Sequence, residues 1–168
     1  MAMFDLKNAT ITLKDGGVGT AQNSLVMKLG EGTLTVTEKR PIEFVRDRGV
    51  LDYIRLADEE PMDVRFDVVF EYYTAQSVTG ANPTPADALK GEGAASAWVT
   101  ASDDACEPYV IDIEVDNAVV CGTGKTAETL TLPDFAWEQM DFDLKAGTLS
   151  VTGRCNATSL TAVRYNAT

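Results

Sequence analysis

The stretch Met62 to Tyr73, MDVRFDVVFEYY, constrains the fold more than any other part of the chain. Its residues alternate between two sides, which is the period of a β-strand and not of a helix. One side is wholly apolar or aromatic: Met62, Val64, Phe66, Val68, Phe70 and Tyr72. The other side is mainly charged: Asp63, Arg65, Asp67, Val69, Glu71 and Tyr73. At about 3.3 Å per residue this strand would span roughly 40 Å, and it predicts a large sheet with one packed face and one wet, acidic face.

Similar alternation elsewhere predicts a mainly β, antiparallel domain over residues 1–168, without a linker that divides it. We expect further strands over residues 4–14, 24–29, 33–45, 50–56, 109–115, 140–145, 148–155 and 160–165, and a loop over 117–128. Side chains expected to face the core are Ala9, Ile11, Leu13, Leu25, Met27, Leu29, Tyr109, Ile111, Ile113 and Val115, whereas Val110, Asp112 and Glu114 are expected to face outward.

One short helix is expected within residues 81–91. Thr84 is a suitable N-cap, Pro85 suits the first helical position, and Gly91 can end the helix. The following segment, residues 94–101, contains Trp98 and fits either an extension of the helix or a short strand. In both cases we expect it to pack against the sheet.

Residues 33–56 predict a long hairpin that turns at Asp47-Arg48-Gly49. Pro41 limits its first strand to an edge, a bulge or a break at that position. A two-stranded hairpin with many charges is not stable alone, so we expect it to pack on a partner. That partner is either the body of its own domain or a neighbouring subunit.

The charge balance narrows the class of protein. With 14 basic and 26 acidic residues the net charge is -12 and the isoelectric point is about 4.3. Such a surface repels nucleic acid and anionic membranes. No apolar run approaches the eighteen or so residues of a membrane helix, and the start of the chain has no signal-peptide pattern.

Catalytic and metal-binding motifs are weak. Histidine is absent, which excludes Ser-His and Cys-His nucleophile pairs and removes the commonest zinc ligand. Cys106, Cys121 and Cys155 lack the close spacing of zinc knuckles, and we expect mostly buried free thiols. The run 122–126 resembles a phosphate-binding loop but has Val119 where that motif needs glycine. We therefore expect no enzyme activity, no cofactor and no metal.

The outward acidic row has two interpretations. Asp63, Asp67 and Glu71, with Asp112 and Glu114, form either an ordinary solvated face or the lining of a negatively charged bore. Arg65 is the single cation in the row on the long strand, whereas an ordinary surface mixes both signs. If several copies formed a ring, phosphates of DNA would find few cations on such a wall.

Several runs of this sequence resemble those of a tail tube protein from a long-tailed bacteriophage. The similarity covers roughly residues 25–165. The runs that carry it are DRG at the hairpin turn, DEEPMDV before the long strand, ALKG in the helix and AGTLSVTG near the C-terminus. Contractile-system inner tubes and type VI secretion tubes are similar in fold, so the resemblance favours a tube without specifying the tail type.

The resemblance implies an antiparallel β-sandwich or rolled barrel with one short flanking helix and a long hairpin. It implies hexameric rings that stack into a tube for the genome and the tape measure protein, with tail terminator and distal tail proteins as further partners. Arg46, Asp47 and Arg48 at the hairpin tip would touch the next ring. The acidic residues Asp63, Asp67, Glu71, Asp112 and Glu114 would face the lumen. The protein would be made in the host cytoplasm and reside in the virion.

The residues alone leave other functions open. A monomeric β-barrel that binds a small ligand in its interior is the main alternative, and a hydrolase that uses carboxylates is a more distant one. A ligand binder should have one enclosed apolar cavity, whereas a tube subunit should have open edges and surfaces for its neighbours.

Overall fold

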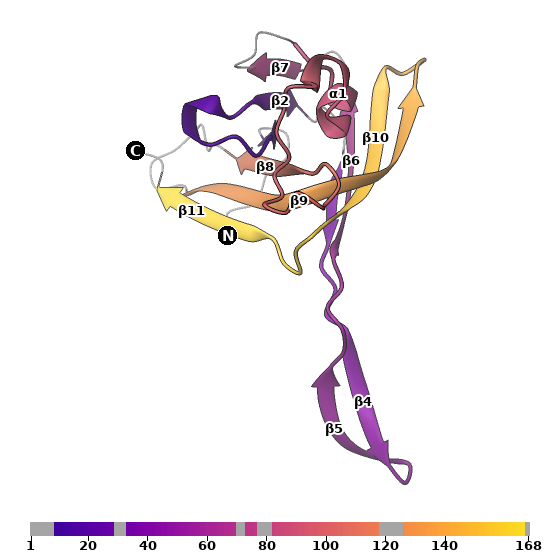
Figure 1. Cartoon of the computed structure of the whole chain (residues 1–168). Coiled ribbons are helices and arrows are strands. Elements are labelled where there is room, and N and C mark those ends of the chain that lie inside the picture. The colour runs from indigo at the N-terminus through magenta and orange to yellow at the C-terminus, as the bar shows by residue number, and fades with distance from the viewer. Residues whose placement is uncertain (1–8, 29–32, 70–72, 77–81, 118–125, 167–168) are drawn as a thin grey trace.

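The computed structural model describes residues 9–28, 33–69, 73–76, 82–117 and 126–166 (Figure 1). It is mainly β, with antiparallel strands and one short α-helix, which confirms the predicted fold class. The strands are β1 (Ala9–Lys14), β2 (Ser24–Lys28), β3 (Leu34–Thr37), β4 (Ile42–Asp47), β5 (Val50–Leu56), β6 (Met62–Val69), β7 (Tyr73–Gln76), β8 (Ile111–Asn117), β9 (Thr126–Asp143), β10 (Thr148–Cys155) and β11 (Thr161–Asn166). The helix is α1 (Pro85–Lys90), and short 3₁₀ turns lie at Gly19–Ala21 and Gly93–Ala95.

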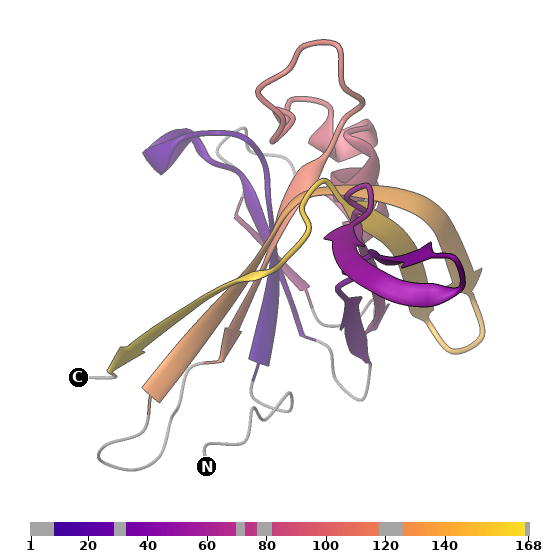
Figure 2. The same ribbon diagram turned by 90° about the horizontal axis from the view of Figure 1, so that it is seen from below.

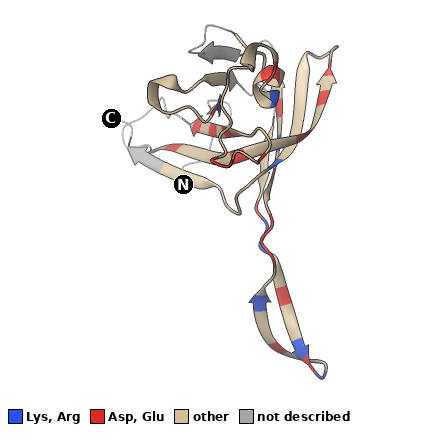
Figure 3. Ribbon diagram, viewed as in Figure 1, with Lys and Arg blue, Asp and Glu red and all other residues tan. Residues whose placement is uncertain are grey.

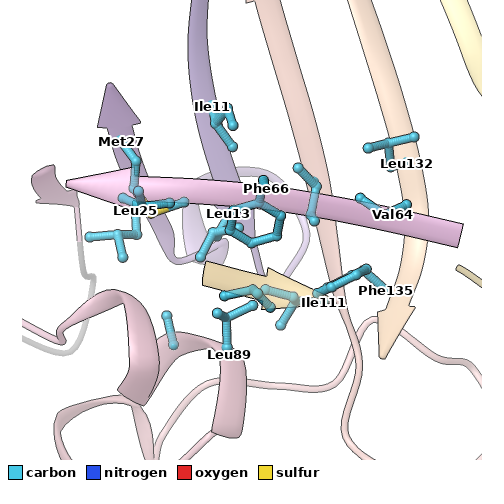
Figure 4. Close-up of a cluster of buried hydrophobic side chains, with 14 of the residues drawn as sticks. Ile11, Leu13, Leu25, Met27, Val64, Phe66, Leu89, Ile111, Leu132 and Phe135 are labelled. Carbon is cyan, nitrogen blue, oxygen red and sulfur yellow. The ribbon is translucent and has the colours of Figure 1, made fainter. Parts of the chain in front are cut away.

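One large sheet has the strand order β3-β6-β10-β9-β8-β1-β2-β7, with β11 also paired to β9. The first part of β9 pairs with β8 and β11, and its second part pairs with β10. Between these parts Asp134 has a positive φ of 49°, and the register with β8 shifts. β9 therefore belongs to two layers, and β6 crosses over the strands of the other layer (Figure 4). The result is a sandwich-like fold.

The core lies between these layers. Burial alternates along β1, β6 and β8, as predicted from the sequence. Phe66 of β6 is fully buried and its ring lies 5.8 Å from that of Phe135 on β9, centroid to centroid. Leu13 from the opposite layer is also fully buried in this cluster (Figure 4). Ile113 of β8 is fully buried in it as well. Hydrophobic burial on the predicted face of β6 thus joins the two layers.

Helix α1 forms where its capping residues predict it. Asp87 N donates to Thr84 Oγ1 (3.2 Å), and Thr84 N donates to Asp87 Oδ2 (3.1 Å), which makes a capping box. Gly91 ends the helix with a φ of 65°. Buried Leu89 docks the helix on the core. In the described part of the chain, no helix is both long enough and apolar enough to cross a membrane.

The segment after the helix is neither of the two predicted elements. It begins with the 3₁₀ turn Gly93–Ala95 and continues as turns and irregular chain to residue 101. The expected packing is confirmed, because Trp98 is only 6% exposed and belongs to the core.

The structure describes the predicted strand over residues 62–73 as two elements, β6 and β7, with different partners. Val69, the last described residue of β6, pairs with Thr148, the first residue of β10. Tyr73 begins β7, which pairs with β2. The positions 70–72, which include Glu71, lie outside the described residues.

The predicted hairpin over residues 33–56 is also two elements. β3 pairs with β6 in the large sheet, and β4 pairs only with β5. Residues 38–41 separate β3 from β4, so of the edge, bulge or break expected at Pro41 the structure has the break.

Two smaller predictions fail near β8 and β9. Val110, expected to face outward, is 5% exposed, because it precedes β8 and its carbonyl accepts a hydrogen bond from Ala101 N. β9 begins at Thr126 and not at 140, so the sequence-based interpretation missed most of the longest strand. Residues 4–8, 29 and 118–125 of the predicted elements lie outside the described residues.

Candidate assembly surface

The hairpin of β4 and β5 extends away from the rest of the protein (Figure 1). Its turn lies where the sequence predicts it, with positive φ at Arg48 (49°) and Gly49 (87°). Two successive positive φ values are typical of the turn that matches the twist of a two-residue hairpin. The base of the hairpin is closed by a hydrogen bond from Ala57 N to Pro41 O (3.1 Å).

One face of this hairpin is apolar. Directly paired residues share a face, and the register pairs Ile42 with Leu56 and Phe44 with Ile54. A bulge at Asp52 places Leu51 opposite Arg46, on the same side as Phe44. We call the following residues, with their exposed fractions, the apolar face of the hairpin: Ile42 (46%), Phe44 (56%), Leu51 (62%), Ile54 (65%) and Leu56 (64%).

The other face of the hairpin is mixed. Arg55 Nε donates to Glu43 Oε2 at 2.6 Å, and the pair lies directly across the two strands. Val45 pairs with Tyr53 beside it. The hairpin is therefore amphipathic, which the sequence-based interpretation missed. The signal was the alternation of IEF in one strand and IRL in the other.

The body of the chain does not cover the hairpin. Every residue of β5 is exposed, and β4 has a single partly buried residue, Val45. Of the two partners expected from the sequence, the chain's own body is therefore excluded. The other expected partner, a neighbouring subunit, remains a proposal.

Ionic contacts hold the neck, residues 38–41 and 57–61, from which the hairpin extends. Lys39 Nζ lies 2.8 Å from Asp63 Oδ2 and 3.5 Å from Glu60 Oε2. The hydrogen bond to Asp63 raises the pKa of Lys39. Two hollows of about 420 and 550 Å³ lie at this neck. Glu59, Glu60, Thr158 and Ser159 line both hollows, and Pro41, Leu56 and Ala57 add apolar surface to the first.

The outward residues of β6 lie on a polar face. Asp67 pairs across the sheet with Ser150 of β10, which in turn pairs with Asp141 of β9. The Ser150 hydroxyl donates to Asp67 and lowers the pKa of that carboxyl, and Thr33 Oγ1 donates to it at 2.8 Å. Asp63, near the neck, is paired with Lys39. We call this surface the polar face of the β3-β6-β10-β9 layer.

Asp112 and Glu114 lie on β8, in the other layer. Lys14 Nζ is 2.7 Å from Glu114 Oε2, and Asp134 N donates to Asp112 Oδ1 at 3.0 Å. The inward residues of β6 and β8 face the same core, so their outward residues point away on opposite sides of the protein (Figure 4). The structure thus brings Asp63 near Asp67 and Asp112 near Glu114, but it does not join the two pairs on one face.

Two open edges flank the β3-β6-β10-β9 layer. Among the described strands β3 pairs with β6 alone. Residues 137–143 of β9 pair with β10 alone, since the ladder with β8 ends at Phe135. An open edge presents unpaired backbone groups and is a template for a strand of another chain.

The described residues give little support for chemistry. They contain no group of three or more His, Cys, Asp or Glu side chains placed to hold a metal ion. Cys155 is buried, and burial raises the pKa of its thiol to about 12, so it is an unreactive core residue. Cys106 is an exposed free thiol, contrary to the expectation of burial, and Cys121 lies outside the described residues.

Comparison of this chain with protein-family models, curated proteins and solved structures gives no match. The main exposed features of the described residues are the apolar face of the hairpin, the open sheet edges and the polar face.

Proposed function

We propose that this protein is a tail tube subunit of a long-tailed bacteriophage, a virion structural protein without catalytic activity. The observation that carries the proposal is the apolar face of the hairpin. Its residues are 46–65% exposed on an element without cover from its own chain. A contiguous exposed apolar patch rimmed by polar residues marks a protein contact. For a subunit that assembles with itself, the protein that covers this face is a second copy of the same chain.

The open edges support a ring of such copies. β3 and the second part of β9 lie on opposite margins of one layer, so the β3 edge of one copy can pair with the β9 edge of the next. Such a contact is heterologous, and its repetition closes a ring or continues as a helix. In this proposal six copies form the ring, and the β3-β6-β10-β9 layers together form its wall.

The polar face of that layer suits the lumen of the ring. Asp67 and Asp141 supply negative charge, whereas Asp63 is paired with Lys39 and Glu138 with Arg154. Arg65, exposed between Asp63 and Asp67, is a cation of the same face. Phosphates of a passing genome would find few free cations there, so DNA would not adhere. Asp112 and Glu114 would lie on the outer wall. The tape measure protein and the terminal tail proteins are further proposed partners.

Electron microscopy of negatively stained protein over a range of concentrations tests this proposal. The matched variant lacks the hairpin, with residues 42–56 replaced by a short Gly-Ser loop. Pro41 and Ala57 are already joined by a backbone hydrogen bond, so such a loop can close without strain. We expect rings or hollow tubes from the wild type. The variant keeps the β3 and β9 edges, so we expect it to stay folded and to form at most single rings and no tubes. Wild-type protein that stays monomeric at every concentration, or a variant that assembles equally well, would contradict the proposal.

A further inference from the structure

The neck connects the β4-β5 hairpin to the body of the protein without help from the core. In Figure 1 the hairpin lies below the body, and in Figure 2, seen from below, it lies in front of the strands of the body. Of the described residues 38–61, none belongs to the hydrophobic core or packs against it. A segment with so few buried apolar contacts is free to move relative to the rest of a protein. The direction of the hairpin therefore depends on the neck.

The two strands of the neck cannot pair regularly, because they differ in length. The β3-β6 ladder ends at the pair of Thr37 and Asp63. The hairpin ladder begins at the pair of Ile42 and Leu56. The residues between these two pairs are four on one strand and six on the other, 38–41 and 57–62. The neck is thus an interruption in one long two-stranded ribbon.

Two prolines limit the directions in which the ribbon can turn. Pro41 precedes β4 and Pro61 precedes β6, and proline fixes its own φ near about -65°. Pro41 O also accepts a hydrogen bond from Ala57 N (3.1 Å), which closes the base of the hairpin. The residues that remain able to turn are 38–40 and 57–60, all of them exposed. Short turning segments between fixed ends are typical of a hinge and not of a loose tether.

Open space lies beside the neck. The two hollows of about 420 and 550 Å³ lie between the neck and the loop that joins β10 to β11. Glu59 and Glu60 line both hollows from the neck, and Thr158 and Ser159 line both from the loop. The base of the hairpin can therefore turn toward this loop without displacing packed side chains.

Lys39 fixes one direction of the neck. Its Nζ lies 2.8 Å from Asp63 Oδ2 on β6 and 3.5 Å from Glu60 Oε2 on the other strand of the neck. Leu160 N also donates to Glu38 Oε1 at 2.8 Å. Figure 3 shows blue and red segments close together along the neck. The three side chains around Lys39 Nζ are 39% to 50% exposed, and such exposed ion pairs are weak and screened by salt.

We infer that the neck is a hinge and that Lys39 is its latch. While Lys39 bridges its two carboxylate partners, the hairpin keeps the direction that the structure shows. When the bridge opens, the hairpin turns toward the loop between β10 and β11. The hairpin is about 20 Å long, so a turn of about 30° moves its tip by about 10 Å. The exposed tip residues Arg46, Asp47 and Arg48 move with it. This hinge is a property of the single subunit and goes beyond the proposed function.

Single-molecule energy transfer between the hairpin and the body tests the hinge. One dye is attached to the native exposed Cys106 and the other to Val50→Cys at the hairpin turn, in a Cys121→Ser background. Cys155 is buried and stays unlabelled. Raising the salt concentration from about 0.01 M to about 1 M shortens the screening length from about 30 Å to about 3 Å. We expect one narrow distribution of transfer efficiency at low salt, and a shifted and broader one at high salt.

Charge reversal tests the latch. Lys39→Glu repels both carboxylates, so at low salt it should reproduce the high-salt distribution of the wild type. Adding Asp63→Lys to Lys39→Glu reverses the pair and should restore the narrow distribution. The matched control is Arg55→Glu, which makes the same change in charge and removes an exposed ion pair with Glu43 that lies within the hairpin. At low salt this control should leave the distribution unchanged.

Each outcome decides the inference. A distribution that is the same at both salt concentrations and in Lys39→Glu means a rigid neck and overturns the hinge. A broad wild-type distribution at low salt, or an equal effect of Arg55→Glu, overturns the role of Lys39 as the latch. The salt series uses protein without a change at the neck, so it decides the question even where a neck variant fails to fold. Single molecules are too dilute to assemble, so the hinge and the tube function can each fail without the other.

Discussion

Replacing Phe44 by threonine should abolish assembly at concentrations where the wild type assembles, without unfolding the subunit. Phe44 lies on the apolar face of the hairpin with 56% of its surface exposed. Threonine keeps the β propensity of the position and removes the aromatic ring. Because the hairpin packs only on itself, the free energy of unfolding of the monomer should change by less than about 0.5 kcal/mol.

The size of the effect follows from the exposed area. A phenylalanine side chain offers about 200 Å², of which the exposed 56% is about 110 Å². If a neighbour covers this area at about 25 cal/mol per Å², its loss costs about 2 to 3 kcal/mol per contact. At about 1.4 kcal/mol for each factor of ten, the critical concentration should rise about 30- to 100-fold.

Sedimentation over a concentration series measures that shift, with thermal unfolding of the monomer alongside it. The matched control is Tyr53→Thr, which removes an aromatic ring of similar exposure, 52%, from the opposite face of the same hairpin. We expect at most a small change for this control. Assembly of Phe44→Thr at the wild-type critical concentration would refute burial of the apolar face between subunits.

Three further predictions concern the core and the charges. Phe66→Ala removes a fully buried ring, so thermal or urea unfolding should show a loss of about 3 to 5 kcal/mol; unchanged melting would mean that Phe66 is not a core residue. Burial, and then repulsion from Asp112, raises the pKa of Asp134, so its carboxylate costs stability at neutral pH. Asp134→Asn, which tolerates the positive φ, should therefore stabilise the protein by about 0.5 kcal/mol at pH 7 and lose that advantage as the pH falls below about 4; a variant less stable at pH 7 contradicts this. Asp67→Lys with Asp141→Lys leaves the Lys39 contacts of the neck in place, so it should allow particles to assemble but impair DNA delivery; full infectivity of such particles would exclude this face from the lumen.

The local features of the fold could be predicted from the sequence. Alternation identified the buried residues of β1, β6 and β8, because each strand has one face on the core. The caps of α1 were predictable because Thr84 and Gly91 act on backbone groups of their own helix.

Pairing between strands could not be predicted in the same way. β6 pairs with β10, and β7 pairs with β2. The alternation of the sequence continues from β6 toward β7, so it does not reveal this change of partner strand. β9 was missed because Pro133 and the bend at Asp134 interrupt its alternation.

The candidate surfaces were predictable only in part. The acidic residues of β6 and β8 were each assigned to an outward face, but their placement in opposite layers depends on how β9 bends. The apolar face of the hairpin was present in the sequence as alternation on both sides of the turn. This face is exposed in the structure because β3 pairs with β6 and not with the hairpin, so that β4 and β5 pair only with each other.

The most direct test of the account is electron cryo-microscopy of concentrated wild-type protein. We predict hollow tubes of stacked six-subunit rings, in which Phe44 and Ile54 are covered by a neighbouring copy and Asp63 and Asp67 face the lumen. Dispersed monomers with an uncovered hairpin, or a solid filament without a lumen, would contradict the account.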